Sequence, residues 1–238
     1  MCIYGTRRYQ RKGLATMRGN KAVSAANRLG PDAGGSSPRA RVLKAAFATF
    51  RKRGFSGAST LEIATRAKVS KRDLYALFGS KHAMLAACIK ERAARMRQPL
   101  ELAAPVPENR QDVAATLVEF GASILRVVCH PDVLTVYRLA IAESDRTPEI
   151  ARTLDRNGRE ANHVALAGWL AKAQAQGLIG AGAPAAIAAH FLATLWGGLL
   201  IQLLLGVREA PSPQEIEARA HAATRAILTL CAPARNGN

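Results

Sequence analysis

Residues 59–81 read STLEIATRAKVSKRDLYALFGSK and contain three serines, Ser59, Ser70 and Ser80. Each serine precedes a segment in which apolar residues recur at three- and four-residue steps, the spacing of an α-helix. Glu62 and Asp73 follow the first two serines, Ser59 and Ser70, by three positions. That spacing is a capping box, in which the serine oxygen accepts a hydrogen bond from an unpaired amide and the carboxylate reaches back.

The serines predict where the helices begin. We expect short helices over 60–67 and 71–78, separated by a tight turn, and a longer helix that begins at Lys81. Another helix precedes them, because apolar residues recur at helical spacing from Arg39 until Gly54 provides a C-terminal stop. Two short helices joined by a tight turn form a helix-turn-helix.

The two short helices combine a small apolar core with a basic outer face. The apolar set is Ile63, Ala64, Val69, Leu74 and Phe78. Ser70, Lys71 and Arg72 open the second helix, and in a helix-turn-helix this part enters the major groove of DNA. The planar fork of Arg72 suits a guanine edge, while Lys71 can read a base or hold a phosphate. Thr60 and Lys81 begin helices, where the helix dipole favours phosphate.

The charge of the chain is divided unevenly. The whole chain of 238 residues carries a formal net charge of +17. Residues 1–100 contain 22 Lys and Arg against 4 Asp and Glu, whereas residues 101–238 contain 12 against 13. The basic part therefore predicts an end that binds a polyanion, and the neutral part predicts a different task. Residues 1–38, with seven Lys and Arg and no apolar period, are predicted to be a disordered basic arm, although Met17 could also begin the chain.

The same stretch resembles the DNA-binding domain of the tetracycline-repressor (TetR) family. The resemblance rests on TLEIA at 60–64, AKVSKRDLY at 67–75 and FGSK at 78–81, and it extends from Arg39 to about Leu85. It implies a helical homodimer that binds a palindromic operator and releases it when a small molecule enters the C-terminal domain. It also implies that the hydroxyl of Tyr75 holds a DNA phosphate.

Two features depart from the family pattern. Lys68 stands in the turn where family members often have glycine, and a lysine in left-handed geometry costs about 1 kcal/mol. Ala76 and Leu77 replace residues that are often polar or histidine in the family, which removes possible base contacts.

The remainder of the chain is also predicted to be helical, so the fold class is all-α. Prolines predict the first turns of several helices, because the amide hydrogen that proline lacks would have no partner within the helix there. These prolines are Pro131, Pro148, Pro184 and Pro213. We expect helices over 109–129, 131–146, 148–176, 185–207 and 213–231. The predicted domains are the arm (1–38), a three-helix DNA-binding domain (39–85) and a helical ligand-binding and dimerisation domain (86–238).

Residues 185–207 form an uncharged, mostly apolar run of 23 residues. Its length would suit a membrane span, but Gly197-Gly198 interrupts it and no second span accompanies it. We therefore favour a helix buried partly against a partner subunit, which together with 213–231 would form a four-helix bundle across a twofold axis. The expected interface residues are Leu199, Leu203, Leu204, Ile216 and Ile227.

Residues 101–183 predict a cavity for a small, largely apolar ligand, because they are apolar, helical and long enough to enclose one. The candidate pocket residues are Arg138, Glu143, His163 and Trp169. The helix from Lys81 would connect this cavity to the DNA-binding helices. The predicted protein is a ligand-responsive regulator of transcription, a repressor, that acts on double-stranded DNA in the cytoplasm.

Rival functions find less support in the sequence. Glu143, Asp145, His130 and His163 could be arranged as an enzyme site, but none has the spacing of a catalytic triad or a metal site. We therefore predict no enzymatic activity, no metal and no cofactor. The four cysteines lie far apart with no C-x-x-C spacing, as expected for free thiols in a reducing compartment. A nonspecific architectural DNA-binding protein would not need the large neutral domain.

Overall fold

The computed structural model describes residues 37–103 and 107–232, which contain helices and no strand. The predicted all-α fold is therefore confirmed. The predicted arm lies outside the described residues, apart from its last two positions.

The first three helices follow the prediction closely. Helix α1 (Pro38–Gly57) is followed by α2 (Thr60–Ala67) and α3 (Lys71–Phe78). Gly54 does not end α1; it is a kink inside it, with φ of 71° and ψ of 176°, and the helix continues to Gly57. A β-carbon at Gly54 would lie 3.5 Å from Leu139, so this kink sits directly against a helix of the C-terminal part.

The serines cap their helices, but the carboxylates do not complete the boxes as predicted. The Ser70 hydroxyl oxygen accepts the amide of Asp73 at 3.0 Å, and Ser59 accepts the amide of Leu61 at 3.2 Å. The Asp73 carboxylate accepts a hydrogen bond from the Ser70 hydroxyl itself, at 2.7 Å. Glu62 instead forms an ion pair with Arg66 one turn later, at 3.2 Å. The reciprocal half of each box is therefore replaced by side-chain contacts.

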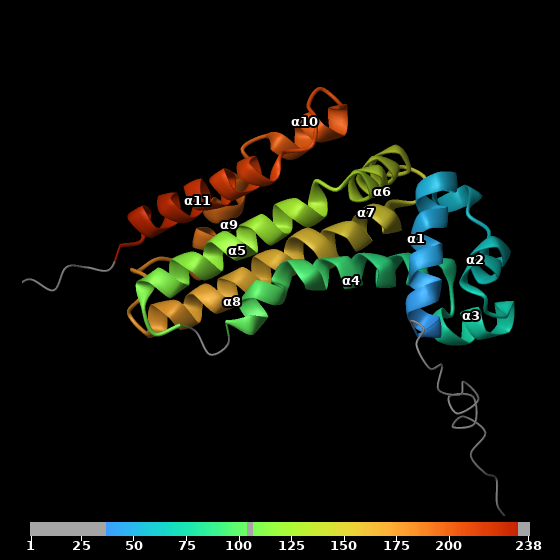
Figure 1. Cartoon of the computed structure of the whole chain (residues 1–238), viewed down its shortest axis with the longest axis horizontal. Helices are drawn as coiled ribbons and strands as arrows, with labels where there is room; N and C mark the ends of the chain where they lie inside the picture. Colours follow the sequence, from blue (N-terminus) through green and yellow to red (C-terminus); the bar gives the residue numbers. More distant parts are fainter. Residues whose placement is uncertain (1–36, 104–106, 233–238) are drawn as a thin grey trace, which may run out of the picture. The chain divides into compact units, whose positions relative to one another are not determined.

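Helix α4 (Lys81–Leu102) leads from the helix-turn-helix into the C-terminal part, as Figure 1 shows. The next elements are α5 (Arg110–Val128), α6 (Pro131–Ala142), α7 (Pro148–Leu154), a π-helix η1 (Asp155–Glu160) and α8 (Ala161–Ala175). The last three are α9 (Pro184–Trp196), α10 (Leu199–Leu205) and α11 (Pro213–Leu230). In the C-terminal part α5 packs against α4 and α11, and α9 packs against α8 and α11.

The predicted helix 148–176 is continuous over 148–175 but contains the π-helix η1, whereas the predicted helix 185–207 is broken by Gly197 and Gly198. Both glycines have positive φ, at 45° and 83°, so α10 leaves the direction of α9 by 47°. No single described helix combines the length and apolar character of a membrane span; the bent pairs α5–α6 and α9–α10 do so only when their two members are joined.

The apolar core of the helix-turn-helix does not end near residue 85. The predicted core residues of α2 and α3 are buried, with Val69 packed at the edge: Ile63, Ala64, Leu74 and Phe78. Val136 and Ala140 of α6, and Ile150 and Leu154 of α7, belong to the same buried cluster. Arg51 of α1 also forms an ion pair with Asp132 of α6. The DNA-binding helices are therefore completed by two helices of the C-terminal part.

Lys68 provides a test of the turn between α2 and α3. It lies in the left-handed region, with φ of 54° and ψ of 48°, and is the sole non-glycine residue with positive φ in the described chain. Replacing it by glycine removes the clash of its β-carbon, and we expect Lys68→Gly to raise the free energy of unfolding by about 0.5–1 kcal/mol. Urea denaturation at a fixed protein concentration measures this change.

Lys68→Ala is the matched control, because it removes the same charge and keeps the β-carbon. We expect no gain in stability from it. Equal stability of the glycine and alanine variants would contradict the proposed strain.

Candidate nucleic-acid interface and internal cavity

The N-terminal turn of α3 presents two free cations. Lys71 and Arg72 are exposed, and neither forms an ion pair or a side-chain hydrogen bond with any residue of the described ranges. Ser70, which precedes them, uses its hydroxyl both to accept the Asp73 amide and to donate to the Asp73 carboxylate. The serine therefore fixes the start of α3, and the two cations remain available for a polyanion.

Thr60 and Tyr75 come together although fifteen residues separate them. The Thr60 hydroxyl at the start of α2 lies 3.4 Å from the Tyr75 hydroxyl on α3. Tyr75 is 41% exposed, more than the other Phe, Tyr and Trp side chains of the described residues. Two adjacent hydroxyls at a helix N-terminus can both donate to one phosphate.

Lys81 begins α4, as predicted, and its side chain also contacts the end of α1. Its ammonium group donates to the carbonyl oxygens of Ser56 and Ala58, at 3.4 and 3.3 Å, and lies 4.6 Å from the centre of the Phe55 ring. These contacts tie the start of α4 to the end of α1. The structure therefore gives Lys81 a structural task that its position at a helix N-terminus did not indicate.

A cavity of about 780 Å³ lies in the C-terminal part. Its walls come from every helix between α4 and α10, including the π-helix. Apolar side chains dominate the lining, and they include Met96, Ile124, Leu192, Trp196 and Leu200. This volume lies within the range that binds drug-sized molecules.

One of the four predicted pocket residues, His163, lines this cavity. Its Nε2 lies 2.9 Å from the carbonyl oxygen of Ala185, so this nitrogen carries the proton. Arg138 instead donates to the carbonyl oxygens of Leu203 and Leu204 and holds the end of α10. Glu143 ends α6, and Trp169 is buried in the main core.

Tyr137 and Asn162, which were not predicted as pocket residues, also line the cavity. Burial raises the pKa of the Tyr137 hydroxyl, so it stays protonated near neutral pH. Asn162 is 4% exposed. The sequence contained one usable signal nearby, Asn157-Gly158 inside a helical pattern, because glycine within a helix often marks an irregularity. Here that irregularity is the π-helix, a form that is frequent at functional sites.

The charged residues of the cavity lining are paired with one another. Arg159 forms ion pairs with Asp155 at 2.5 Å and with Glu160 at 3.5 Å. The hydrogen bond from Arg159 holds the pKa of Asp155 below its usual range, so this carboxylate stays ionised. All three are exposed, so the charge lies where the cavity meets solvent.

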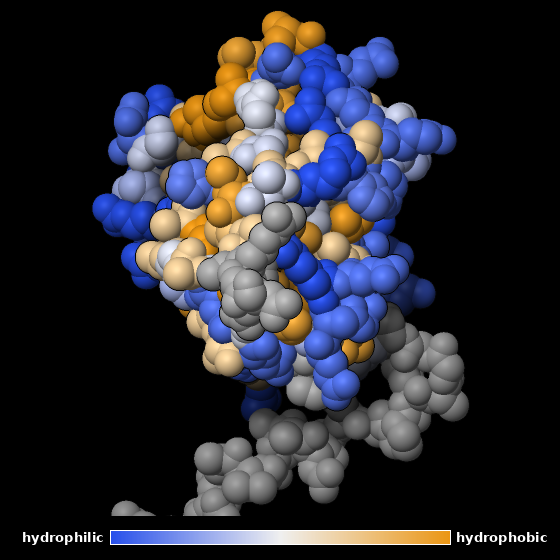
Figure 2. All heavy atoms as spheres, turned by 90° about the vertical axis from the view of Figure 1, so that its left-hand side faces the viewer, coloured by the Kyte–Doolittle hydropathy of each residue, from blue (hydrophilic) through white to orange (hydrophobic). Residues whose placement is uncertain are grey.

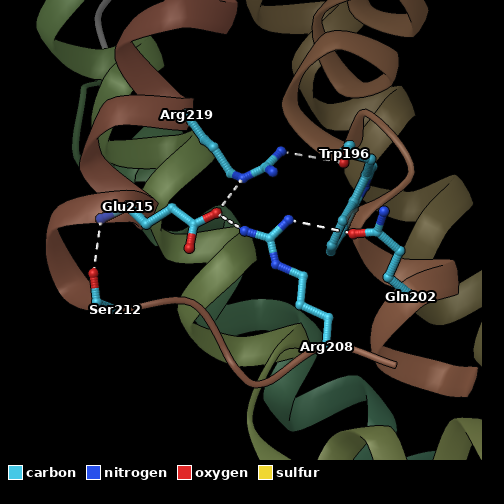
Figure 3. A network of polar contacts seen from close by, with 6 residues as sticks. All are labelled: Trp196, Gln202, Arg208, Ser212, Glu215 and Arg219. Carbon is cyan, nitrogen blue, oxygen red and sulfur yellow. Dashed lines mark hydrogen bonds and ion pairs between the residues drawn. The ribbon is translucent and has the colours of Figure 1, made fainter. Parts of the chain in front are cut away.

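A polar network fixes the break between α9 and α10, next to the cavity. Figure 3 shows Arg219 of α11 between the Glu215 carboxylate and the carbonyl oxygen of Trp196, at 3.1 and 3.4 Å. Arg208 joins the same carboxylate to the side chain of Gln202. Hydrogen bonds from Arg219 and then Arg208 lower the pKa of Glu215. The network keeps Trp196, a cavity wall residue, attached to α11.

The residues predicted for a subunit interface lie mainly inside the chain. The side chains of Leu199, Leu203, Ile216 and Ile227 are buried in the main core, and Leu204 is partly exposed. The outward face of α11 carries small and polar residues instead: Ala218, His221, Ala222 and Arg225. Ala186 and His190 are likewise exposed on α9, while the exposed Ala189 and Ala193 line the cavity. The pattern of leucines and isoleucines therefore marked the core of one chain.

Large apolar side chains are also exposed on and after α10. Ile201, Leu205 and Val207 are 61%, 72% and 74% exposed. Figure 2 shows hydrophobic atoms gathered at the top of the molecule, at the height of α10 in Figure 1.

The histidines of the rival enzyme reading bond to the backbone. His130 caps α6 by accepting the Asp132 amide, and His163 contacts Ala185 as described. Within the described ranges no group of three His, Cys, Asp or Glu side chains could hold a metal ion. Cys88, Cys129 and Cys231 are free thiols.

The comparisons with known proteins agree with this architecture. A family model described as bacterial regulatory proteins, tetR family, matches residues 42–88. A second, described as AefR-like transcriptional repressor, C-terminal domain, matches residues 115–232. No match was found among curated protein sequences.

Several solved structures are similar over most of their length. A protein from Mesorhizobium loti assigned to the TetR family is 25% identical, with a TM-score of 0.67, over 81% of this chain and 96% of its own. The flavonoid-responsive regulator FrrA is 29% identical, with a TM-score of 0.62, over 83% and 98%. A TetR transcriptional regulator from Agrobacterium tumefaciens is 26% identical, with a TM-score of 0.65, over 82% and 95%.

The two family models together span the helix-turn-helix and the helices that enclose the cavity, and the solved structures share both parts. This chain belongs to the TetR family of transcriptional regulators.

Proposed function

We propose that this regulator is a repressor that binds a palindromic operator as a homodimer and releases it when a small, largely apolar ligand fills the cavity. The observation that carries the proposal is a shared wall. Ala140 of α6 and Leu154 of α7 line the cavity and are also buried in the core of the DNA-binding helices. A ligand that displaces this wall must repack that core.

Through the shared wall, the cavity would be coupled to the DNA-binding helices by a shorter route than the predicted one along the helix from Lys81. Helix α4 does connect the two parts, since it begins beside α3 and contributes Met96 to the cavity. Helix α6 additionally contacts α1 through Leu139 at the Gly54 kink and through the ion pair of Asp132 with Arg51. A tightly packed core responds to a change in volume by shifting its helices. The distance between the two recognition helices of a dimer would change as a result.

The name of one relative supports the ligand part of the proposal. FrrA is described as responsive to flavonoids, which are largely apolar molecules, and it resembles this chain in both parts. By analogy, we propose that this chain also responds to an apolar effector. We place the protein in the cytoplasm, where DNA is accessible and free thiols such as Cys88 stay reduced.

We assign the DNA contacts from the exposure of each side chain and from the contacts that it makes within the chain. Arg72 reads a base edge, Lys71 reads a base or holds a phosphate, and Thr60 and Tyr75 share one phosphate. Ser70 and Lys81 act on DNA through the helices that they position. The subunits meet through the outward faces of α9 and α11, whose small side chains allow close packing of helices.

The first prediction separates base reading from general affinity. We expect Arg72→Ala to weaken binding to the operator by about 1–3 kcal/mol and to relax sequence preference at one base step per half-site. The operator is recovered by selection from a randomised duplex pool with the full chain, and binding is measured by fluorescence anisotropy at several salt concentrations. Lys172→Ala, an exposed change on α8, serves as the control and should leave binding unchanged.

An equal loss of affinity for operator and random DNA would contradict the assignment of Arg72. Lys81→Ala, in contrast, should lower thermal stability together with affinity, because it removes two hydrogen bonds to the end of α1.

The second prediction concerns the dimer. Ala222→Arg places a large charged side chain on the outward face of α11, so we expect it to produce folded monomers that bind the palindrome weakly. Light scattering measures the mass and circular dichroism the helix content. Ala171→Arg on the exposed face of α8 is the control and should remain dimeric. A dimeric Ala222→Arg protein would exclude this face as the interface.

Leu203→Arg is expected to behave differently from Ala222→Arg. Leu203 is 2% exposed within one chain, so a charge there should unfold the C-terminal part and not merely separate subunits.

The third prediction tests coupling between cavity and operator. An apolar compound that quenches tryptophan fluorescence should weaken operator binding about 5–150-fold at saturation, and operator should weaken binding of that compound by the same factor. Trp196→Phe should remove most of the quenching, since Trp196 lines the cavity and Trp169 does not. A compound that saturates the cavity and leaves operator affinity unchanged would refute the coupling.

A further inference from the structure

Asn162 is an isolated polar group in the cavity. It lies in the first turn of α8 and is 4% exposed. Its Nδ2 donates to the sulfur of Met96 at 3.3 Å, and its Oδ1 accepts no hydrogen bond from any described residue. A buried amide oxygen without a donor is costly, so it calls for a partner that the described part of the chain does not supply.

The orientation of the amide follows from the chemistry of its neighbour. The sulfur of Met96 has no hydrogen to donate and accepts weakly. The amide nitrogen, with two hydrogens, is therefore the atom that faces it. The carbonyl oxygen of Asn162 is therefore the atom left without a partner at the cavity wall, and it can only accept a hydrogen bond. It has almost no accessible surface, so a ligand group reaches it when the side chain turns toward the cavity.

The remaining polar groups of the cavity disfavour an anionic ligand. Arg159 is the one Lys or Arg among the described lining residues, and Asp155 and Glu160 both pair with it. The lining therefore carries two carboxylates against one guanidinium. The Nε2 proton of His163 is engaged by the Ala185 carbonyl. A carboxylate or phosphate in the cavity would lose its hydration without gaining a free cation.

The walls accommodate a flat apolar body. Trp196 and Tyr137 supply aromatic surface, and Ile124 and Leu200 supply aliphatic surface. The Tyr137 hydroxyl lies opposite the π-helix, 3.9 Å from the position that a β-carbon of Gly158 would take. The absence of a side chain at Gly158 leaves that space open beside the hydroxyl.

We infer that the effector is an uncharged, mostly apolar molecule with a hydroxyl or N–H group, and that this group donates a hydrogen bond to Oδ1 of Asn162. The inference rests on the proposed function, because it names the chemistry of the effector of that regulator. Asn162 then selects hydroxylated ligands over ligands of the same shape that lack a donor.

Four biphenyl probes test this assignment with the full-length protein. 4-Phenylphenol has a donor, 4-methoxybiphenyl has an acceptor without a donor, biphenyl has neither, and biphenyl-4-carboxylate is an anion. Fluorescence titration and calorimetry give the Kd of each. We expect 4-phenylphenol to bind about tenfold more tightly than 4-methoxybiphenyl, the effect of one hydrogen bond to a buried acceptor, and the carboxylate to bind most weakly.

Asn162→Leu removes the acceptor at nearly constant volume and should reduce the ratio of the two Kd values to about one. Comparing this Kd ratio between the wild-type protein and Asn162→Leu isolates the hydrogen bond to Asn162. Differences in hydration between the two probes are the same for both proteins and cancel in this comparison. Thr224→Val is the matched control: its Oγ1 is also buried without a partner, but it lies on α11 outside the cavity, and the ratio should stay near ten. The wild-type comparison does not depend on the folding of either variant.

Each other result overturns the inference in a distinguishable way. Equal binding of phenol and ether to the wild-type protein overturns the role of the donor and leaves the cavity as a ligand site. A tenfold ratio that persists in Asn162→Leu shows that another group accepts the hydrogen bond. No binding of any probe overturns the inference together with the ligand part of the proposed function, while operator binding, measured separately, still tests the DNA-binding part.

Discussion

Helices α6 and α7 pack on one side against α1 and α4 and on the other side enclose the cavity, so Ala140 and Leu154 are buried by both. A change on either side of these two helices therefore affects the packing on the other side. Val136 and Ile150 belong to the buried cluster of the DNA-binding helices, where α6 packs against α1 and α7 packs against α4. The cavity wall therefore contacts the two helices against which α2 and α3 pack.

Close helix packing on the far side of the cavity depends on glycine. A β-carbon at Gly121 of α5 would lie 3.2 Å from both Leu195 and Phe191 of α9, which is closer than most such contacts allow. The absence of this carbon lets α9 approach α5, and the Phe120 and Phe191 rings stack with centroids 6.2 Å apart. Beside this dense packing α9 ends at Trp196, and both Trp196 and Leu200 of α10 line the cavity.

Electrostatics are arranged differently in the two parts. On the helix-turn-helix, Lys71 and Arg72 are exposed and unpaired among the described residues, so their charge is available to DNA phosphates and bases. At the cavity, Arg159 is paired with Asp155, and beside it Arg208 and Arg219 share Glu215. Arg72 of the helix-turn-helix is therefore available to bind DNA, whereas the arginines at and beside the cavity stabilise the fold. The difference is that carboxylates pair with those arginines, and none pairs with Arg72 among the described residues.

The sequence by itself determined the helix-turn-helix, because the serine caps and the helical spacing of apolar residues are local signals. It also located the basic surface, since Lys71 and Arg72 needed no distant partner to be exposed. Tertiary structure alone decided which apolar residues face a partner and which face the core: Leu203 and Ile227 read as an interface, yet neighbouring helices cover them. It also decided the cavity, because Asn162, Tyr137 and Trp196 come from three separate helices. Periodicity reports which face of a helix is apolar, but not what packs against that face.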